Sequence, residues 1–417
     1  MSKIKHIYAR QVLDSRGFPT IESTVILSDG ASATSSIPSG DSRGTYEALE
    51  LRDNDVNHFQ GMGVLNAVSN VNDIIFSKIE GMEAFNQQAI DKAMIELDGT
   101  QNKGRLGANA ILSVSQATFK AAAKSSLLPL SLYTMQFLNS TVEKKIPIPM
   151  FNILEGGKHA PHSINIQECL IIPASSKSYD ESLEIGVNVY QSLKKLLEEK
   201  GLSTLVAQDG GFTTDSYNNE QALSLVKSAI DSAGYSFTLD VFMGLDITAN
   251  NLKDGRTYRL KDRSSPYTVN DLIDFYQNLS TEFSLIYLED PMAEDDWEGW
   301  KKLYSVLGNK VLLAGDDLTV TNPYRLQLAL DNNVIGGIVI KPNQIGTVSE
   351  AIAVCEIARY KNLKIIVSNR GGETMDDFIA DFAVGVGADY VKFGSPARER
   401  VAKYNRLSEI EKEMNRI

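Results

Sequence analysis

Short apolar runs recur through the second part of the chain, and each ends on a polar or ionisable residue. In chain order they include SLIYLED, KVLLAGDD, IGGIVIK, KIIVSN and YVKFG, most of them followed by a stretch with helical spacing. The later run ends lie roughly 22 to 29 residues apart, about one strand, one helix and two short loops. This rhythm predicts parallel βα units, enough of them to close a barrel whose strand ends carry the active site.

The first part of the chain has a different pattern, in which polar and apolar residues alternate as they do in strands. KIKHIYARQVLD and PTIESTVILSDGASATSSI are rich in β-branched residues, and the turn sequences SRGF and SDG divide them. This pattern predicts a three-stranded antiparallel meander. Three later segments have apolar residues at three- and four-residue spacing and predict helices: VLNAVSNVNDIIFSKI, QQAIDKAMIELDG and GANAILSVSQATFKAAAKSS.

We therefore expect an α/β fold with two domains. Residues 1–135 should form an α+β cap, and residues 136–417 a TIM-like (β/α) barrel. A chain of 417 residues is long enough to bury a core in each domain.

Charge and hydropathy narrow the classes of function. A net charge of −12 argues against non-specific binding to nucleic acid, and an anionic substrate would need local positive charge or a metal ion. No apolar stretch approaches the length of a membrane span, and the start MSKIKHIYARQVLDSRG lacks a signal-peptide core. We expect a cytoplasmic protein with no membrane partner, in which Cys169 and Cys355 are reduced core residues.

Three carboxylates stand at the ends of apolar runs in the predicted barrel. Asp246 follows VFMGL, Glu289 follows SLIYL and Asp316 follows VLLAG. Carboxylates that converge at one barrel mouth repel each other unless a divalent cation joins them, and an all-oxygen set suits Mg²⁺. The alternative is that each acid caps a helix or lies in its first turn.

The next run ends are cationic. Lys341 follows GGIVI, Arg370 follows KIIVSN and Lys392 follows DYV. A lysine beside a dication has a lowered proton affinity and can act as a base, whereas a guanidinium can hold phosphate or carboxylate with two bonds. The alternative is a ring of salt bridges that holds the barrel mouth together.

A dication with a lysine base is the equipment for removing a proton α to a carboxylate. The metal stabilises the resulting dianion, and an acid on the other face then assists the departure of a β substituent. Three residues are candidates for that acid: Asp209 in LVAQDGGF, Glu168 in INIQECL and His159 in EGGKHA. Asp209 also has an ordinary structural interpretation, because Asp and Gly are common in turns.

Collinear motifs along the whole chain resemble one family, the enolases or phosphopyruvate hydratases. They are DSRGFPTIE, PSGDSRG, ALELRD, ELDGT, LGANAILSVS, GGKHA, IQE, LEDPMAEDDWEGW, GDDLTVTNP, IKPNQIGT, ADFAVG and RVAKYNRL. The resemblance implies an α+β cap and a barrel that begins ββαα with one antiparallel strand. It also implies two Mg²⁺ ions and a homodimer or higher homo-oligomer.

The resemblance assigns roles to single residues. It places the tighter Mg²⁺ on Asp246, Glu289 and Asp316, and it gives Ser42 to the second ion.

On the substrate side, the resemblance makes Lys341 the proton-abstracting base. Arg370 and Lys392 would hold the phosphate and the carboxylate, while His159 and Glu168 line the pocket.

Several positions depart from the family pattern. AQDGG replaces GDEGG, so that Asp209 stands where the family has the Glu that assists departure of hydroxide. SNRGGE replaces SHRSGE, which puts Asn369 for a His near that acid and Gly371 for a Ser that helps to hold phosphate. EGGKHA replaces NGGEHA, which introduces Glu155 and Lys158. The metal and base residues keep the family's identity, so the changes gather on the acid and phosphate side.

Three functions are consistent with these observations. The first is Mg²⁺-dependent removal of an α proton from a 2-phospho carboxylate followed by β-elimination, as in an enolase that converts 2-phosphoglycerate into phosphoenolpyruvate and water. The second is an enolase paralogue on a modified anionic substrate, such as carboxyphosphonoenolpyruvate synthase of phosphonate biosynthesis. The third is a non-catalytic binding protein on the enolase fold.

Overall fold

The computed structural model describes residues 2–40, 44–161, 163–214 and 217–414. Its N-terminal part carries a three-stranded antiparallel sheet in the order β1-β2-β3, as the alternating pattern predicts. The turns between these strands use Gly17 and Gly30, both with positive φ, a conformation open to glycine. The strands are β1 (Ile4–Leu13), β2 (Pro19–Leu27) and β3 (Ser32–Ser36).

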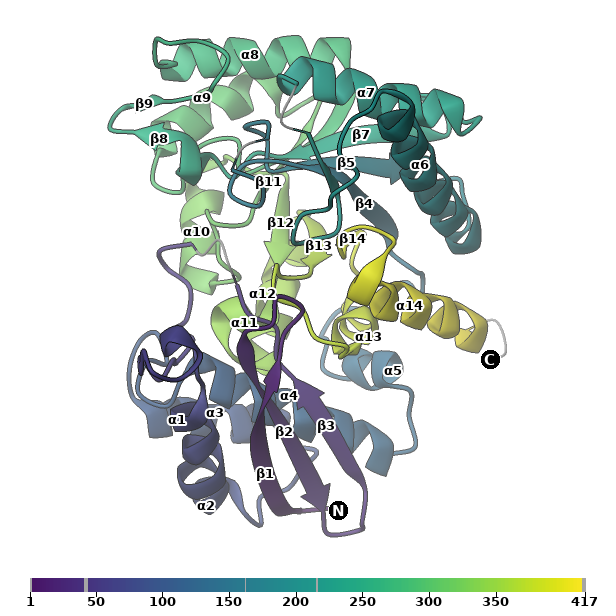
Figure 1. Ribbon diagram of the computed structural model, residues 1–417. Coiled ribbons are helices and arrows are strands. Elements are labelled where there is room, and N and C mark those ends of the chain that lie inside the picture. The colour runs from purple at the N-terminus through teal and green to yellow at the C-terminus, as the bar shows by residue number, and fades with distance from the viewer. Residues whose placement is uncertain (1, 41–43, 162, 215–216, 415–417) are drawn as a thin grey trace.

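Helices cover one side of this cap sheet (Figure 1). The predicted helix near residue 70 forms as two α-helical pieces joined by a π-helical segment, and the other two predicted helices form as expected. α4 packs directly on β2 and β3, and it is buried over nearly its whole length. The cap helices are η1 (Phe59–Gly61), α1 (Leu65–Ser69), η2 (Asn70–Ile75), α2 (Phe76–Ile79), α3 (Gln87–Asp98), α4 (Ala108–Ser125) and α5 (Leu130–Met135).

Within the described residues, eight strands close into the predicted barrel, because β14 pairs with β4. β5 runs antiparallel to both of its neighbours, and the other strands of the ring are parallel. This is the ββαα start that the resemblance implied. The strands are β4 (Ile148–Glu155), β5 (Glu168–Pro173), β7 (Val241–Asp246), β10 (Leu285–Glu289), β11 (Leu312–Gly315), β12 (Gly337–Ile340), β13 (Lys364–Ser368) and β14 (Tyr390–Lys392).

Helices surround the barrel, and local signals start several of them. Ser178 and Thr268 form capping boxes at the starts of α6 and α8, in which side chain and backbone satisfy each other. The helices are α6 (Tyr179–Glu199), α7 (Asn219–Ser232), α8 (Val269–Glu282), α9 (Trp297–Leu307), α10 (Pro323–Asn332), α11 (Pro342–Ile345), α12 (Val348–Tyr360), α13 (Phe378–Gly385) and α14 (Val401–Met414). The short elements are β6 (Phe212–Thr213), η3 (Ala249–Leu252), β8 (Lys253–Asp254), β9 (Thr257–Tyr258) and η4 (Arg398–Arg400).

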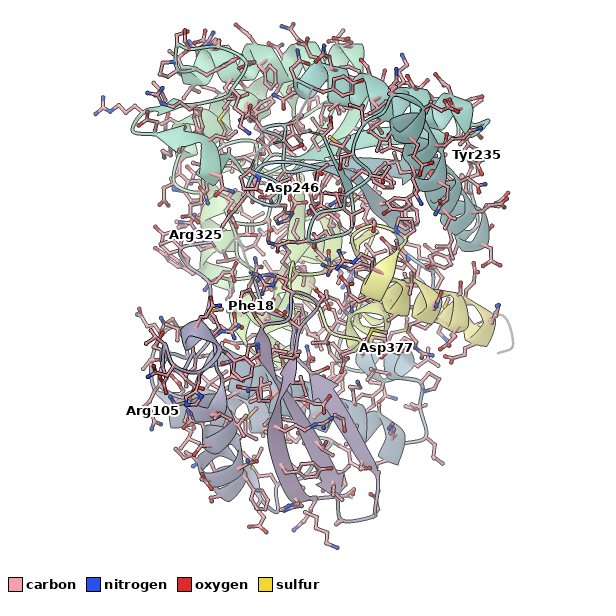
Figure 2. All side chains as sticks on the ribbon, viewed as in Figure 1. Phe18, Arg105, Tyr235, Asp246, Arg325 and Asp377 are labelled. Carbon is pink, nitrogen blue, oxygen red and sulfur yellow. The ribbon has the colours of Figure 1, made fainter. Side chains whose placement is uncertain are left out.

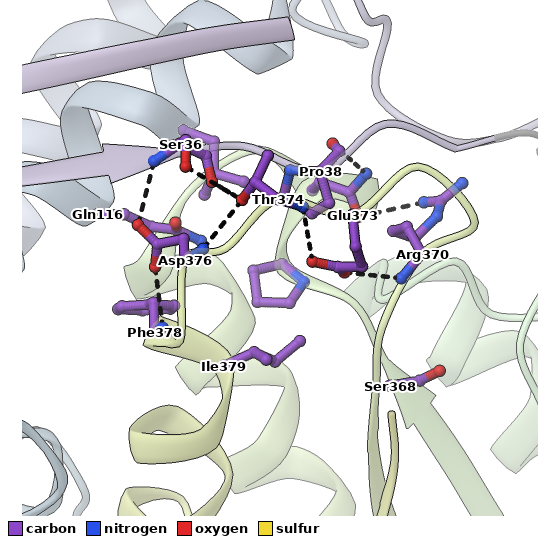
Figure 3. Close-up of a pocket in the computed structure, with 13 residues that line it drawn as sticks. Ser36, Pro38, Gln116, Ser368, Arg370, Glu373, Thr374, Asp376, Phe378 and Ile379 are labelled. Carbon is purple, nitrogen blue, oxygen red and sulfur yellow. Dashed lines mark hydrogen bonds between the residues drawn. The ribbon is translucent and has the colours of Figure 1, made fainter. Parts of the chain in front are cut away.

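The cap lies against one side of the barrel, where α3, α4 and α5 pack on α11, α12 and α13 (Figure 1). Figure 3 shows a cavity along this seam, where side chains of the cap meet the loop that follows β13. The backbone N–H of Ser36 and the Nζ of Lys120 donate to Asp376 Oδ2 at 3.1 and 3.0 Å. The cap therefore holds the loop that carries Asn369, Arg370 and Gly371.

The two cysteines are buried and free, as the sequence predicts. Among the described helices, none combines the length and apolar character that a bilayer crossing requires.

Candidate active site

The carboxyl ends of β7 and β10 and the amino end of the antiparallel strand β5 bring three carboxylates to the same height in the barrel mouth. Asp246, the last residue of β7, is labelled in Figure 2. In the strand register it lies opposite Glu168 on β5 and opposite Glu289 on β10. The Nζ of Lys392, at the end of β14, donates to one oxygen of each, at 2.9 Å in all three cases. Asp246 and Glu289 thus converge as predicted, with a lysine ammonium between them.

Burial and mutual repulsion shape the charge state of this group. Burial, with a contribution from Asp246, raises the pKa of Glu289 to about 7, although Lys392 opposes the shift. For Lys392 burial opposes the charge, but the surrounding carboxylates outweigh it and hold its pKa well above the ordinary value. The strand ends therefore form a site that favours positive charge.

Asp316 and Lys341 form a second pair, beside the first. The Nζ of Lys341 donates to Asp316 Oδ2, and the side-chain amide of Gln344 donates to the other oxygen at 2.8 Å. Burial opposes the charge of Lys341, but Asp316 outweighs it and raises the pKa of that lysine. Lys341 is therefore protonated while it contacts Asp316.

The donor chemistry at these strand ends fits a hard divalent cation. Carboxylate oxygens are the ligands that Mg²⁺ prefers, and one oxygen each of Glu168, Asp246 and Glu289 lies 2.9 Å from the Lys392 ammonium. Asp316 belongs to a different group of acids. One carboxylate oxygen of Asp316 lies within 4.8 Å of a carboxylate oxygen of Asp290 and of Asp317. Ser42, the predicted ligand of a second ion, lies outside the described residues.

Asp290 has a structural task within that close group. Its carboxylate accepts the backbone N–H groups of Asp316 at 3.0 Å and Asp317 at 2.7 Å. Asp290 therefore fixes the loop that presents Asp316 to the barrel mouth.

Asp209 lies in a turn, as its structural interpretation expects, and it also lines the pocket. Its Oδ1 accepts a bond from Nη2 of Arg400 at 2.8 Å, and the Arg400 side chain is 0% exposed. Burial opposes the charge of Asp209, but the guanidinium outweighs it and lowers the pKa well below the usual range. Asp209 is therefore a carboxylate at neutral pH.

His159 lies in the loop between β4 and β5, close to Asp209 and Glu168. One donor atom of each of the three residues lies within 4.8 Å of those of the others. Nδ1 of His159 is 3.3 Å from Glu155 Oε2, an ion-pair distance. Burial opposes the charge of His159, but Glu155, Asp209 and Glu168 outweigh it and raise its pKa to about 9.

We call Glu47, Asn369, Arg370 and Gly371 the phosphate side. Their polar groups form hydrogen bonds with one another and with Arg400. Nη1 and Nη2 of Arg370 donate to the two carboxylate oxygens of Glu47 at 2.9 and 3.1 Å. The side-chain amide of Asn369 donates to the backbone oxygen of Arg370 at 3.2 Å. The carbonyl of Gly371 accepts a bond from Arg400 at 2.8 Å.

Residues of these groups line a small polar pocket in the barrel mouth. Most of the residues predicted from the sequence line the pocket. Glu289 and Asp316 do not line it, but they bind the lining residues Lys392 and Lys341. The lining residues are His159, Gln167, Glu168, Asp209, Asp246, Lys341, Ser368, Asn369, Arg370, Gly371 and Lys392.

Two sides of the pocket can be distinguished. β5 and β12 are four strands apart in the ring of eight described strands, so their ends face each other across the mouth. The base side comprises Asp246, Glu289, Asp316, Lys341 and Lys392. The acid side comprises Glu155, His159, Glu168, Asp209 and Arg400.

Sequence reasoning missed three contacts of the site. Arg400 and Glu47 carry no local signal, because their partners lie 191 and 323 residues away in the chain. Glu155 ends the apolar run MFNIL just as Glu289 ends SLIYL, so the signal for a strand-end acid was present.

Two family models match this chain. The enolase N-terminal domain matches residues 4–134, and the enolase C-terminal TIM barrel domain matches residues 143–417. The chain belongs to the enolase family.

Proposed function

Starting from this family membership, we propose that the protein removes the α proton of a 2-phospho carboxylate and then eliminates a β substituent. The substrate that we favour is 2-phosphoglycerate, which would give phosphoenolpyruvate and water. One observation carries the proposal: in a single pocket, Lys341, the residue after β12, lies across the barrel mouth from the group formed by His159, Glu168 and Asp209.

The first step belongs to the base side. Lys341 takes the α proton as a neutral amine, which requires that Asp316 release it from their present pairing. A divalent cation held by Asp246, Glu289 and Asp316 would supply Lewis-acid stabilisation of the charge that develops on the substrate carboxylate. Lys392 then provides fixed positive charge beside the same carboxylate.

The second step belongs to the acid side. The electrons of the broken C–H bond form the double bond, and the β oxygen leaves with a proton supplied by the protein. His159, Glu168 and Asp209 are the groups near enough to one another to share that task.

A second candidate function is the same first step on a modified anionic substrate, as in carboxyphosphonoenolpyruvate synthase. The observation that favours it lies on the phosphate side. The guanidinium of Arg370 donates two hydrogen bonds to the carboxylate of Glu47. Gly371 has no hydroxyl group that could bind a phosphate. The departures from the family pattern therefore lie where a phosphate would be recognised.

Two assays with Mg²⁺ and 2-phosphoglycerate test the proposal. Phosphoenolpyruvate is followed by its absorbance, and exchange of the α proton into deuterated water is followed by NMR. We expect both activities, and Lys341→Ala should abolish exchange. Lys364→Ala is the matched control, because Lys364 starts β13 at the opposite end of the barrel, on the surface.

The outcomes separate the candidates. Exchange without dehydration would favour the modified substrate. Exchange that survives Lys341→Ala would mean that another residue is the base. Absence of both activities, together with failure to bind Mg²⁺, would contradict both candidates and favour a binding protein.

A further inference from the structure

Building on the proposed function, we propose that His159, and not Asp209, donates the proton to the leaving β oxygen. Glu155 is the positioning residue that keeps His159 in its proton-bearing form. In the motif that this chain resembles, the acid stands at the position of Asp209 and an amide stands at the position of Glu155.

Asp209 is committed to another partner. Besides its bond to the Asp209 carboxylate, Arg400 donates to the backbone oxygens of Gln208, Arg370 and Gly371 at 2.9, 2.6 and 2.8 Å. Protonation of Asp209 would remove the carboxylate that Nη2 of the fully buried guanidinium contacts and leave Glu399, 3.0 Å from Nε, as its nearest remaining counter-charge, which is unfavourable. A group held as a carboxylate in this way has no proton to give.

His159 has the opposite environment. Three acidic side chains face it from three different segments: Glu155 from β4, Glu168 from β5, and Asp209 from the turn after Val206. Such surroundings favour an imidazolium, and its raised pKa of about 9 agrees with this geometry. Nδ1 faces Glu155, which leaves Nε2 as the ring nitrogen that can meet a ligand in the pocket that His159 lines.

Glu155 is built into the acid side. It is the last residue of β4, its side chain is 0% exposed, and its Oε1 accepts the backbone N–H of Gly211 at 2.6 Å. A Cβ on Gly211 would lie 2.9 Å from that oxygen, so a larger residue there would displace the Glu155 carboxylate. Glu155 thus joins the EGGKHA loop to the QDGG turn and adds a negative charge that an amide cannot supply.

The proton step balances with groups that are present. Lys341 takes the α proton, the C–H electrons form the double bond, and the C–O bond breaks. The imidazolium of His159 gives its proton to the departing oxygen, which leaves as water. The imidazole regains a proton from solvent.

An NMR titration tests the charge state of His159 without turnover, so its result is independent of the proposed function. The chain has four histidines, and His159→Gln identifies the signal that belongs to His159. We expect a midpoint near 9, and we expect Glu155→Gln to lower it by about one unit or more. His58→Gln, which changes an exposed histidine of the cap, should leave it unchanged. A midpoint at or below about 6.5 would overturn the proposal.

Kinetics test the donor itself. His159→Gln should reduce β-elimination by about 10² to 10⁴ while α-proton exchange continues, because the base side is intact. Glu155→Gln should lower elimination chiefly above neutral pH, and Glu155→Asp should restore part of the loss. Retained elimination in His159→Gln, with elimination lost in folded Asp209→Asn, would overturn the proposal. If the unaltered protein shows no exchange, the proposed function fails while the titration still decides the state of His159.

Discussion

The base side and the acid side of the pocket are built from different kinds of structure. On the base side, Asp246 and Glu289 end neighbouring strands of a regular sheet, and their positions follow from its register. On the acid side, His159 and Asp209 lie in a loop and a turn, and Arg400 comes from the segment after β14. Loops can change their residues without disturbing strand pairing. Apart from Glu155, which ends β4, the departures from the family pattern among the described residues therefore lie in loops and turns.

The base side, the acid side and the phosphate side share one property, which is that their cations already have anionic partners. Lys392 and Lys341 contact strand-end carboxylates, Arg370 contacts Glu47, and Arg400 contacts Asp209. An anionic substrate must therefore exchange with an internal partner or arrive with a compensating cation. The difference lies in which pairs can open: those of the base side face the pocket, whereas that of Arg400 is closed off by backbone.

Removal of divalent cations should have the largest effect and should separate the two sides. In excess chelator, α-proton exchange should fall by about 10³-fold or more, because a metal ion contributes several kcal/mol of charge stabilisation. The NMR titration of His159 should not change, because its partners lie on the acid side. Exchange is measured with chelator and again after Mg²⁺ is restored. Full exchange in chelator would show that the base side works without a metal ion.

Arg400→Met should have the next largest effect, on stability. It leaves Asp209 buried without its guanidinium, and loss of one partner of a buried ion pair costs about 3 to 5 kcal/mol. Urea unfolding measures the change. The control is Arg10→Ala, whose partner Glu22 lies in an exposed pair on the cap, worth at most about 1 kcal/mol. Equal losses in the two variants would mean that this ion pair does not hold the acid side together.

The pH dependence should distinguish the two steps. The folded-state pKa of His159, about 9, lies above its unfolded value of about 6.5. Its stabilising charge is therefore fully present below about 6.5 and is lost as the pH rises through about 9. Elimination should fall about tenfold per pH unit above that midpoint, while α-proton exchange should lack this limb. Parallel profiles would contradict the separation of the two sides.

Glu47→Gln should have the smallest effect, and it tests the phosphate side. Removing the carboxylate from the fork of Arg370 should strengthen binding of inorganic phosphate by about tenfold or less, because one charge-assisted partner is lost. Calorimetry gives the dissociation constant. Glu199→Gln, on the exposed end of α6, is the control. Unchanged binding would place the anion site away from Arg370.

Much of the fold could be predicted, because its signals are local and repeated. The apolar runs before Asp246, Glu289 and Asp316 each form a strand of the ring. The acid is either the last residue of that strand or the residue after it. In a parallel barrel the carboxyl ends of the strands share one rim, so convergence at the mouth follows from the pattern. The lysines with which these carboxylates form ion pairs could not be predicted in the same way. Lys392 joins Asp246 and Glu289, whereas Asp316 pairs with Lys341.

The sequence by itself determined the barrel, the cap, the family and the strand-end residues. Hydrophobic periodicity repeats along the chain and specifies secondary structure without knowledge of distant partners. The tertiary structure alone decided the charge states. The pKa of Asp209 is lowered because Arg400 lies against it, and the pKa of His159 is raised because Glu155 lies beside it. Electrostatic energy depends on burial and on distances of a few ångströms between residues far apart in the chain, and a sequence pattern contains neither quantity.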